Sequence, residues 1–520
     1  MTILAVVGTL LGSAFALNTP ANAAPVACWD SVRTDLDGGG PDVVVGLPSY
    51  DLPGKPDAGA IVLYSNVASE GSSEPSKATK RTLITADDLD GLASQSGARF
   101  GAAVTIWNEG GDPDDCGNVL IGAPGQTVGG KTGAGQVYLV AGSATGLNDV
   151  VSVLDEDSII GAGGAQGGAA FGASIAVEDA SMVAIGAPKR NIGAVKNAGH
   201  VIRLDYRLSA TPDVLVVQQG AGSGVPETED RFGEVLDTYG TGEGPVLLIG
   251  IPREDIGKKT DAGAVGMQPP IGPLTMVNQD SPGAAGAAER GDRFGAAIDS
   301  YSTFDVDHPV IKVAVGVPGE DVGSASNVGA VAFAEIDLFV EGQDAVSPLT
   351  GTSRTLTQAT RGVAGSNESG DAFGSSVVVG ELGAERLRLA AGAPGENVGK
   401  VVDAGLVTLV TIDPVTAKPT GGSQPGSWGQ NSPGVNGKAE RGDAFGSSLS
   451  GVQLTTVQED DDVVWAILLA TAPGENSGSV SDSGTATLGG GPGHTSVPLS
   501  PPVVQKHAGR GMAAFRMLLG

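Results

Sequence analysis

The chain has 520 residues, of which 40% are hydrophobic and 17% are charged, and its formal net charge is −29. This apolar fraction is enough for a folded core and argues against wholesale disorder. The strongly acidic balance, without a basic patch, argues against a nucleic-acid partner and against docking on anionic lipid. An acidic surface is compatible with divalent cations or simply with solubility.

The N-terminus predicts export. An apolar run, Ile3–Leu17, is followed by the small residues Ala21 and Ala23, which fit a signal-peptidase site, although no Lys or Arg precedes the run. We expect residues 1–24 to be a secretory signal peptide, residues 25–520 to form a single domain, and the protein to be extracellular. No other segment is long and apolar enough to cross a bilayer, and we expect a monomer.

A short pattern recurs seven times along the chain. Each copy has an apolar-Gly-x-Pro or similar stretch followed by a Gly eleven residues past the Pro, and the spacing within a copy is constant while the copies lie 64 to 79 residues apart. The prolines are Pro48, Pro124, Pro188, Pro252, Pro318, Pro394 and Pro473. A constant inner spacing within a variable outer period indicates one supersecondary unit with insertions in its loops.

Each copy predicts four short strands separated by turn residues. We name them A, which begins at a Phe-Gly pair, B, which ends at the Pro, C, which begins near the later Gly, and D. Seven such units predict an all-β, seven-bladed β-propeller rather than an open solenoid. Six Phe-Gly pairs precede a Pro, but the first Pro lacks one, and Phe515 lies 70 residues after Phe445. We therefore expect the C-terminal strand to join the N-terminal blade and close the ring.

Most of the recurrent acidic residues are interpreted as turn residues. Asp or Asn recurs three and nine residues past the Pro, and Gly recurs five past it, which is the chemistry of tight turns. The tripeptides Arg290-Gly-Asp292 and Arg441-Gly-Asp443 resemble adhesion motifs. Gly-Asp also precedes Phe373 in the same register, so we assign these tripeptides to the D–A turn.

The Phe-Gly and Gly-Ala-Pro elements together resemble FG-GAP repeats. Full copies include Phe100-Gly101 with Gly122-Ala-Pro124 and Phe373-Gly374 with Gly392-Ala-Pro394. The chain is similar to the propeller of integrin α subunits, and more closely to secreted actinobacterial FG-GAP proteins. This resemblance implies calcium in A–B loops. Asp35, Asp37 and Asp42 are the nearest match here, one residue short and lacking the middle acid; the alternative is a solvated acidic loop.

The two cysteines, Cys28 and Cys116, predict one disulfide in an exported chain, with two free thiols as the alternative. No histidine lies in a metal-ligand spacing and no nucleophile elbow is present, so we name no catalytic residue and no organic cofactor. His200 and His308 are interpreted as structural or solvated.

The leading functional hypothesis is a non-catalytic propeller that binds an extracellular glycan, cell-wall component or protein. Its specificity would come from the variable D–A segments, of which the long ones are Gly272–Asp292, Gly362–Asp371 and Gly421–Asp443. An extracellular hydrolase acting on lipid or polysaccharide, and a structural cell-envelope protein, are the alternatives.

Overall fold

The structure is a computed structural model. It describes residues 34–68, 75–107, 116–143, 146–147, 149–178, 181–207, 211–220, 224–241, 244–303, 310–336, 353–381, 386–420, 426–435, 437–453, 466–476, 480, 483–489, 496–499 and 513–514. The signal peptide expected at residues 1–24 lies outside this range and stays a prediction.

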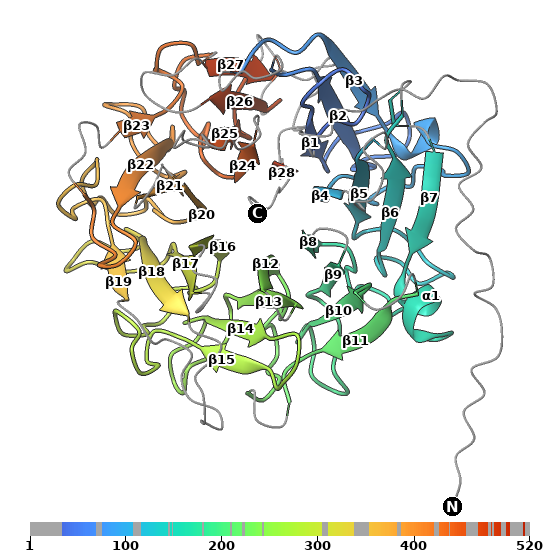
Figure 1. The fold of residues 1–520 in the computed structure, drawn as a ribbon, viewed down its shortest axis with the longest axis horizontal. Coiled ribbons are helices and arrows are strands. Elements are labelled where there is room, and N and C mark those ends of the chain that lie inside the picture. The colour runs from blue at the N-terminus through green and yellow to red at the C-terminus, as the bar shows by residue number, and fades with distance from the viewer. Residues whose placement is uncertain are drawn as a thin grey trace, which may run out of the picture.

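Seven four-stranded antiparallel sheets form a ring, as the sequence predicted (Figure 1). From the centre outward, blade 1 is β28 (Ala513–Ala514), β1 (Val43–Leu47), β2 (Ala60–Ser65) and β3 (Lys80–Ile84); blade 2 is β4 (Ala103–Trp107), β5 (Asn118–Ala123), β6 (Gln136–Ala141) and β7 (Asp149–Leu154); blade 3 is β8 (Ser174–Glu178), β9 (Met182–Ala187), β10 (His200–Asp205) and β11 (Asp213–Val217).

The remaining four blades repeat this order. Blade 4 is β12 (Val235–Thr241), β13 (Gly244–Ile251), β14 (Ala264–Gln268) and β15 (Thr275–Val277); blade 5 is β16 (Ala297–Thr303), β17 (Val310–Val317), β18 (Ala330–Ile336) and β19 (Arg354–Leu356); blade 6 is β20 (Ser376–Glu381), β21 (Leu387–Ala393), β22 (Leu406–Ile412) and β23 (Gly426–Trp428); blade 7 is β24 (Leu449–Gln453), β25 (Ala466–Ala472), β26 (Thr485–Gly489) and β27 (Ser496–Leu499). A short helix, α1 (Glu156–Ile160), and a 3₁₀ turn, η1 (Ala86–Asp88), follow β7 and β3.

The C-terminal strand closes the ring. β28 pairs antiparallel with β1, with Ala513 opposite Gly46 and Ala514 opposite Val45. The first blade therefore takes its inner strand from the C-terminus, which confirms the expected closure. Phe515, on which the prediction depended, lies outside the described residues.

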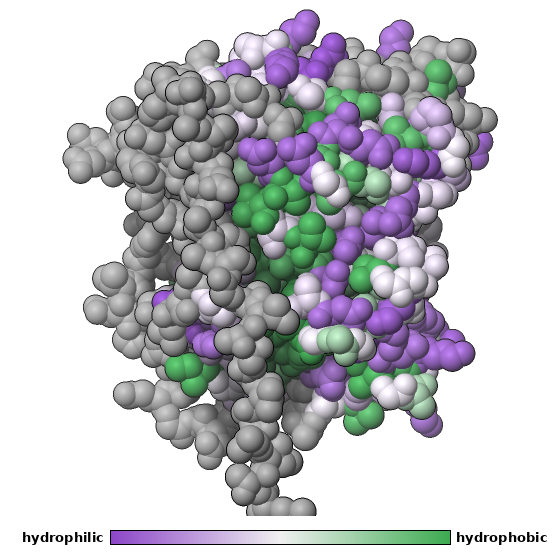
Figure 2. Space-filling model, turned by 90° about the vertical axis from the view of Figure 1, so that its right-hand side faces the viewer, coloured by the Kyte–Doolittle hydropathy of each residue, from purple (hydrophilic) through white to green (hydrophobic). Residues whose placement is uncertain are grey.

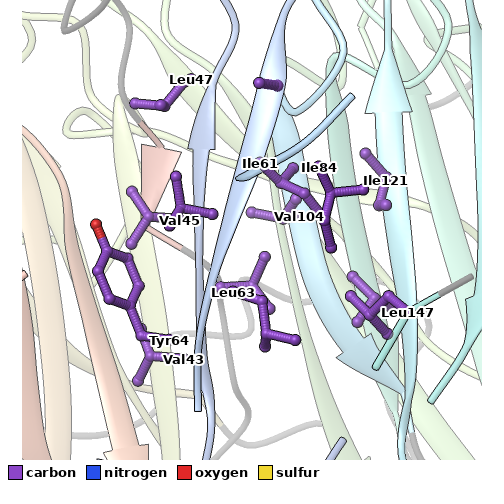
Figure 3. Close-up of a cluster of buried hydrophobic side chains, with 14 of the residues drawn as sticks. Val43, Val45, Leu47, Ile61, Leu63, Tyr64, Ile84, Val104, Ile121 and Leu147 are labelled. Atoms are coloured by element: carbon purple, nitrogen blue, oxygen red, sulfur yellow. The ribbon is translucent and has the colours of Figure 1, made fainter. Parts of the chain in front are cut away.

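The core lies between the faces of adjacent blades. All five residues of β1 and all six of β2 are buried, because a blade packs against a neighbour on both faces. These strands therefore consist of nearly continuous apolar residues instead of alternating with polar ones. Figure 3 shows both faces of blade 1. Leu63 lies on the side of Val104 and Ile121 of blade 2, whereas Val43 and Val45 lie with Tyr64 on the opposite side. On that side the Tyr64 hydroxyl donates to the Leu499 carbonyl of blade 7 at 3.1 Å.

In the six copies where the described residues include both partners, the Gly eleven residues past the Pro is required by the next blade. Gly329 has φ +81°, and a Cβ there would lie 2.3 Å from both the backbone nitrogen and the oxygen of Phe373 in blade 6. The two residues form a parallel bridge, and the Phe373 N–H donates to the Val328 carbonyl at 3.0 Å. The same Gly–Phe bridge links blade 1 to 2, 3 to 4, 4 to 5 and 6 to 7, so the two halves of the motif belong to adjacent blades.

The B–C connections are turns stabilised by their own side chains, which confirms that interpretation. The residue three past the Pro accepts a hydrogen bond from the backbone N–H of the residue nine past it. For Asp321 and Asn327 the distance is 2.7 Å, and for Asp51 and Asp57 it is 2.8 Å. Each of these later residues has positive φ, which Asn and Asp tolerate.

The outer strands of blades 2 and 3 carry exposed apolar side chains. Val153 on β7 and Val214, Leu215 and Val216 on β11 are each at least 38% exposed. Figure 2 shows this side of the ring as apolar surface interspersed with polar side chains. Within the described residues no helix is long and apolar enough to span a membrane.

Candidate functional site

The three aspartates expected to bind calcium do converge. One carboxyl oxygen from each of Asp35, Asp37 and Asp42 lies within 4.8 Å of the others. They occupy the loop that leads into β1, and no other such group of acidic, His or Cys side chains occurs in the described residues. Asp35 and Asp42 are buried, and Asp37 is half-buried.

Backbone N–H groups hold two of these carboxylates in place. Asp35 Oδ1 accepts from the N–H of Asp37 at 3.2 Å and of Gly38 at 2.7 Å. Asp42 accepts from Leu36 at 2.8 Å and from Asn66, at the end of the neighbouring strand β2, at 2.9 Å. The loop is thus a preformed turn, in which Gly38 has positive φ.

The charge balance of this loop favours a bound cation or a proton. The pKa of Asp42 is raised to about 8, chiefly by burial and also by the charge of Asp37, while the two backbone hydrogen bonds oppose the rise. Asp37 Oδ1 is buried and has no hydrogen-bond partner. A cation at the convergence point would compensate both groups.

These residues fit a calcium ion in their chemistry. Ca²⁺ binds carboxylate and carbonyl oxygens, and the loop brings three carboxylates together. The other acidic A–B loops, at Asp112–Asp115, Asp305–Asp307 and Glu459–Asp462, lie outside the described residues.

Of the two cysteines in the predicted disulfide, Cys116 lies within the described residues. Cys116 lies next to Gly117, whose N–H donates to the Asp35 carbonyl at 2.9 Å, so this cysteine is close to the acidic loop. Cys116 is not a free thiol. Cys28 lies outside the described residues, and the pairing stays a prediction.

The Arg-Gly-Asp tripeptides are turn elements, as interpreted. Asp292 is 1% exposed and Asp443 is fully buried. Each accepts a hydrogen bond at 2.5 Å from the backbone N–H three residues earlier, Glu289 and Glu440 respectively. An adhesion receptor could not reach either carboxylate without unfolding the turn.

A second set of polar residues, which the sequence analysis missed, lies between blades. Gln219, Gln279, Gln358 and Gln430 each follow an outer strand by two residues, and each donates to a Glu two residues past the next blade's Pro. The sequence did contain a sign of these pairs, because Gln recurs two residues past the outer strands and Glu recurs two residues past the Pro of the motif.

His200 is structural, as one of the two interpretations held. It is 1% exposed, and its Nε2 lies 2.7 Å from Glu156 Oε1. Arg190 Nη1 lies 2.8 Å from the same oxygen. His308 lies outside the described residues.

A cavity of about 290 Å³ lies among the inner strands of six blades. Its lining is dominated by small and hydroxyl side chains such as Ser375 and Ser447, and Glu234 and Asp299 are the acidic residues in it. Asp299 Oδ2 accepts from the Val379 N–H at 2.7 Å.

Comparisons with known proteins find only distant similarity. No family model and no curated protein matches the sequence. Among solved structures, the periplasmic gluconolactonase of Pseudomonas aeruginosa is similar at 10% identity and TM-score 0.40, covering 89% of this chain and 98% of its own.

Two glycosidases are similar over a smaller part of the chain. An α-L-arabinofuranosidase from Lactobacillus brevis has 11% identity and TM-score 0.31, covering 64% of this chain and 94% of its own. A GH43 β-1,3-galactosidase has 11% identity and TM-score 0.30, covering 61% and 89%. At these values we transfer no activity, and the FG-GAP resemblance stays a prediction. What the geometry identifies is a seven-bladed β-propeller with an acidic oxygen cluster at the entry to its first blade.

Proposed function

We propose that this chain is a secreted, non-catalytic β-propeller of the FG-GAP kind, which binds an extracellular protein, glycan or cell-wall component and is stabilised by Ca²⁺. Asp35, Asp37 and Asp42 hold the ion. The observation that carries the proposal is the convergence of the three carboxylates, two of them buried, together with the Asp37 oxygen that has no hydrogen-bond partner.

The ion would stabilise the ring itself. The acidic loop leads directly into β1, whose other neighbour is the closing strand β28. It also contacts blade 2 through the bond from Gly117 to the Asp35 carbonyl. Calcium bound there would therefore stabilise the blade at which the ring closes, without touching a partner.

Calcium binding tests the first half of the proposal. Isothermal titration of the chelator-treated full chain with CaCl₂ should show binding that Asp37→Asn weakens at least tenfold. Asp90→Asn is the matched control, because Asp90 is exposed, and it should bind as the wild type does. Equal affinity in all three proteins would contradict the site.

Partner capture tests the second half. The variable D–A segments lie on the opposite face from the acidic loop, because antiparallel blades place alternate connections on opposite faces. Two of the expected segments, Gly272–Asp292 and Gly421–Asp443, include the outer strands β15 and β23, so only the parts after those strands are D–A connections. Replacing residues 280–291, 362–370 or 431–442 with a short segment from another blade should abolish retention of cell-wall or surface ligands. Unchanged retention by all three chimeras would eliminate this face as the binding surface.

A hydrolase acting on lipid or polysaccharide is the second candidate, favoured by the two acidic residues in the central cavity. Paired carboxylates are the usual apparatus of glycoside hydrolysis. Purified protein would be assayed on ester, phosphodiester and glycoside substrates beside Glu234→Gln and Asp299→Asn. Turnover that both variants abolish would replace the non-catalytic proposal.

A further inference from the structure

Where adjacent blades meet, three residues come together whose positions keep constant offsets from the outer strand, from the Phe and from the Pro. The segment that joins one blade's outer strand to the next blade's inner strand contributes two positions, one two residues past the outer strand and one two residues before the Phe. The next blade contributes the residue two past its Pro. We call this set of three positions a junction.

Four successive junctions, from blade 3 to blade 7, contain the same three residue types. They are Gln219, Asp230 and Glu254; Gln279, Asp292 and Glu320; Gln358, Asp371 and Glu396; and Gln430, Asp443 and Glu475. In each junction the Gln Nε2 donates to the Glu carboxyl, at 2.6 Å for Gln219 and Gln358 and at 2.8 Å for Gln279. All four Gln and all four Asp side chains are at most 3% exposed.

Each of these junctions has too few hydrogen-bond donors for its acceptors. The Gln Oε1 atom is buried without a partner in all four, and the Asp Oδ1 atom is buried without a partner in three, at Asp292, Asp371 and Asp443. The other Asp oxygen accepts one backbone N–H, as from Glu368 to Asp371 at 2.7 Å. A proton on one carboxyl group would supply the missing donor and remove one of two buried charges.

The junction between blades 2 and 3 contains a positive charge, which the four acidic junctions lack. There the first position is Glu156, and the position two past the Pro is Arg190, whose guanidinium lies 2.8 Å from the buried carboxylate. The position before Phe171 is Ala169. This junction has its own cation, whereas the junction between blades 1 and 2 has only Ala86, Ala98 and Gln126 and carries no charge.

The environment of the four acidic junctions favours the protonated state. Burial raises the pKa of Glu254 to about 8, that of Glu320, Glu475 and Asp371 to about 7, and that of Asp230 and Asp292 to about 6. The pKa values of Glu396 and Asp443 are raised for the same reason. In each of these eight groups at least one nearby carboxylate adds to the effect of burial, and in four of them that carboxylate is the other member of the pair.

We propose that these four junctions form a proton-operated lock on the ring. Each is closed while its Asp–Glu pair retains a proton and is weakened when that proton is lost. The segment from blade 3 to blade 7 is then tighter in mildly acidic surroundings than in alkaline ones. The lock is independent of the proposed calcium site, which lies in blade 1.

Nearly all the charged groups around the lock are acidic. Besides the pairs themselves they are Glu227 and Asp255 at the first junction, Glu289, Asp321 and Lys259 at the second, Glu368 at the third, and Glu440 at the fourth. All but Lys259 are acidic, so they oppose ionisation of the pairs. Lys259 lowers the pKa of Asp292, but it does so less than burial, Glu289 and Asp321 raise it.

The sign of the pH dependence follows from the raised pKa values. A group that binds its proton more tightly when folded contributes stability that is complete below its unfolded pKa, about 4 for Asp and Glu. That contribution is lost as the pH rises through the folded pKa values, which lie from about 6 to about 8. Between the unfolded and the folded pKa values, unfolding releases the proton that a closed junction holds, so each junction should make the unfolding equilibrium constant rise by up to about tenfold per pH unit, and this rise should level off above the folded pKa.

The test compares urea unfolding of full-length proteins from pH 5 to pH 9 in EDTA. The variant carries Gln in place of all four junction glutamates, as blade 2 has naturally at Gln126. Its unfolding constant should change with pH much less than that of the wild type between pH 6 and 8. A control with the same charge change replaces the exposed residues Asp90, Asp149, Asp213 and Asp403 by Asn and should keep the wild-type dependence.

Two further measurements make the outcome decisive. If the fourfold variant does not fold, Glu396→Gln alone should remove about a quarter of the dependence. Hydrogen exchange, corrected for intrinsic rates, should rise with pH in residues 358–373 of the wild type but not in the single variant. Equal pH dependence in wild type and variant would overturn the lock. The lock would also be overturned if added CaCl₂ removed the pH dependence of unfolding in a protein that carries Asp37→Asn, because the junctions would then bind a metal ion.

Discussion

Substituting Gly329 by Ala tests the inter-blade bridge that explains the repeat. The new methyl group would lie 2.3 Å from two backbone atoms of Phe373, and the backbone has φ +81°. Because an L-residue in left-handed conformation costs about 1–2 kcal/mol and an orphaned buried N–H about 1–3 kcal/mol, we expect a total loss of about 2–5 kcal/mol. Part of that loss arises as the fully buried Phe373 ring moves from its site.

Gly323, in the turn just before, is the matched control. It has φ +66°, but a Cβ there would meet nothing within 4 Å. Gly323→Ala therefore isolates the backbone term of about 1–2 kcal/mol. Both variants would be unfolded in urea and followed by far-ultraviolet circular dichroism at fixed pH and calcium. Destabilisation that is equal within 1 kcal/mol would refute the claim that contact with the next blade requires the glycine.

Three further predictions address the charged junction, the cysteines and the ring closure. Arg190→Met should cost about 2–3 kcal/mol, since it removes one partner from a buried carboxylate while His200 remains; adding Glu156→Gln should recover most of that loss in the same urea assay. If Cys28 and Cys116 pair, intact-mass analysis of the exported protein after alkylation should show no added label until a reductant is present, and labelling without reductant would contradict the pairing. Deleting residues 511–520 removes β28, which should lower the unfolding midpoint and raise hydrogen exchange in β1; unchanged exchange in β1 would mean that the closing strand contributes little.

The ring could be predicted from the sequence because its motif is local chemistry repeated at constant spacing. Pro48 and its six counterparts end strands, and Gly329 and its counterparts mark positions where the chain passes close to another backbone. The phase of the motif, with Phe515 after the last complete copy, indicates that the ring closes at the first blade. The Asx turns were predictable for the same reason, since Asp321 and Asn327 interact within one connection.

Only the tertiary structure decided which residues meet between blades. Gln358 and Glu396 are 38 residues apart. Both positions recur along the chain, but recurrence alone does not indicate that the two side chains meet or that they are buried. The acidic loop shows the same division. The sequence placed Asp35, Asp37 and Asp42 close along the chain, but burial of Asp42 and the unpartnered oxygen of Asp37 depend on how β2 and blade 2 pack around the loop. Spacing along a chain can specify turns and strand ends, whereas desolvation, which sets the charge of a buried carboxyl group, depends on neighbours brought together only by folding.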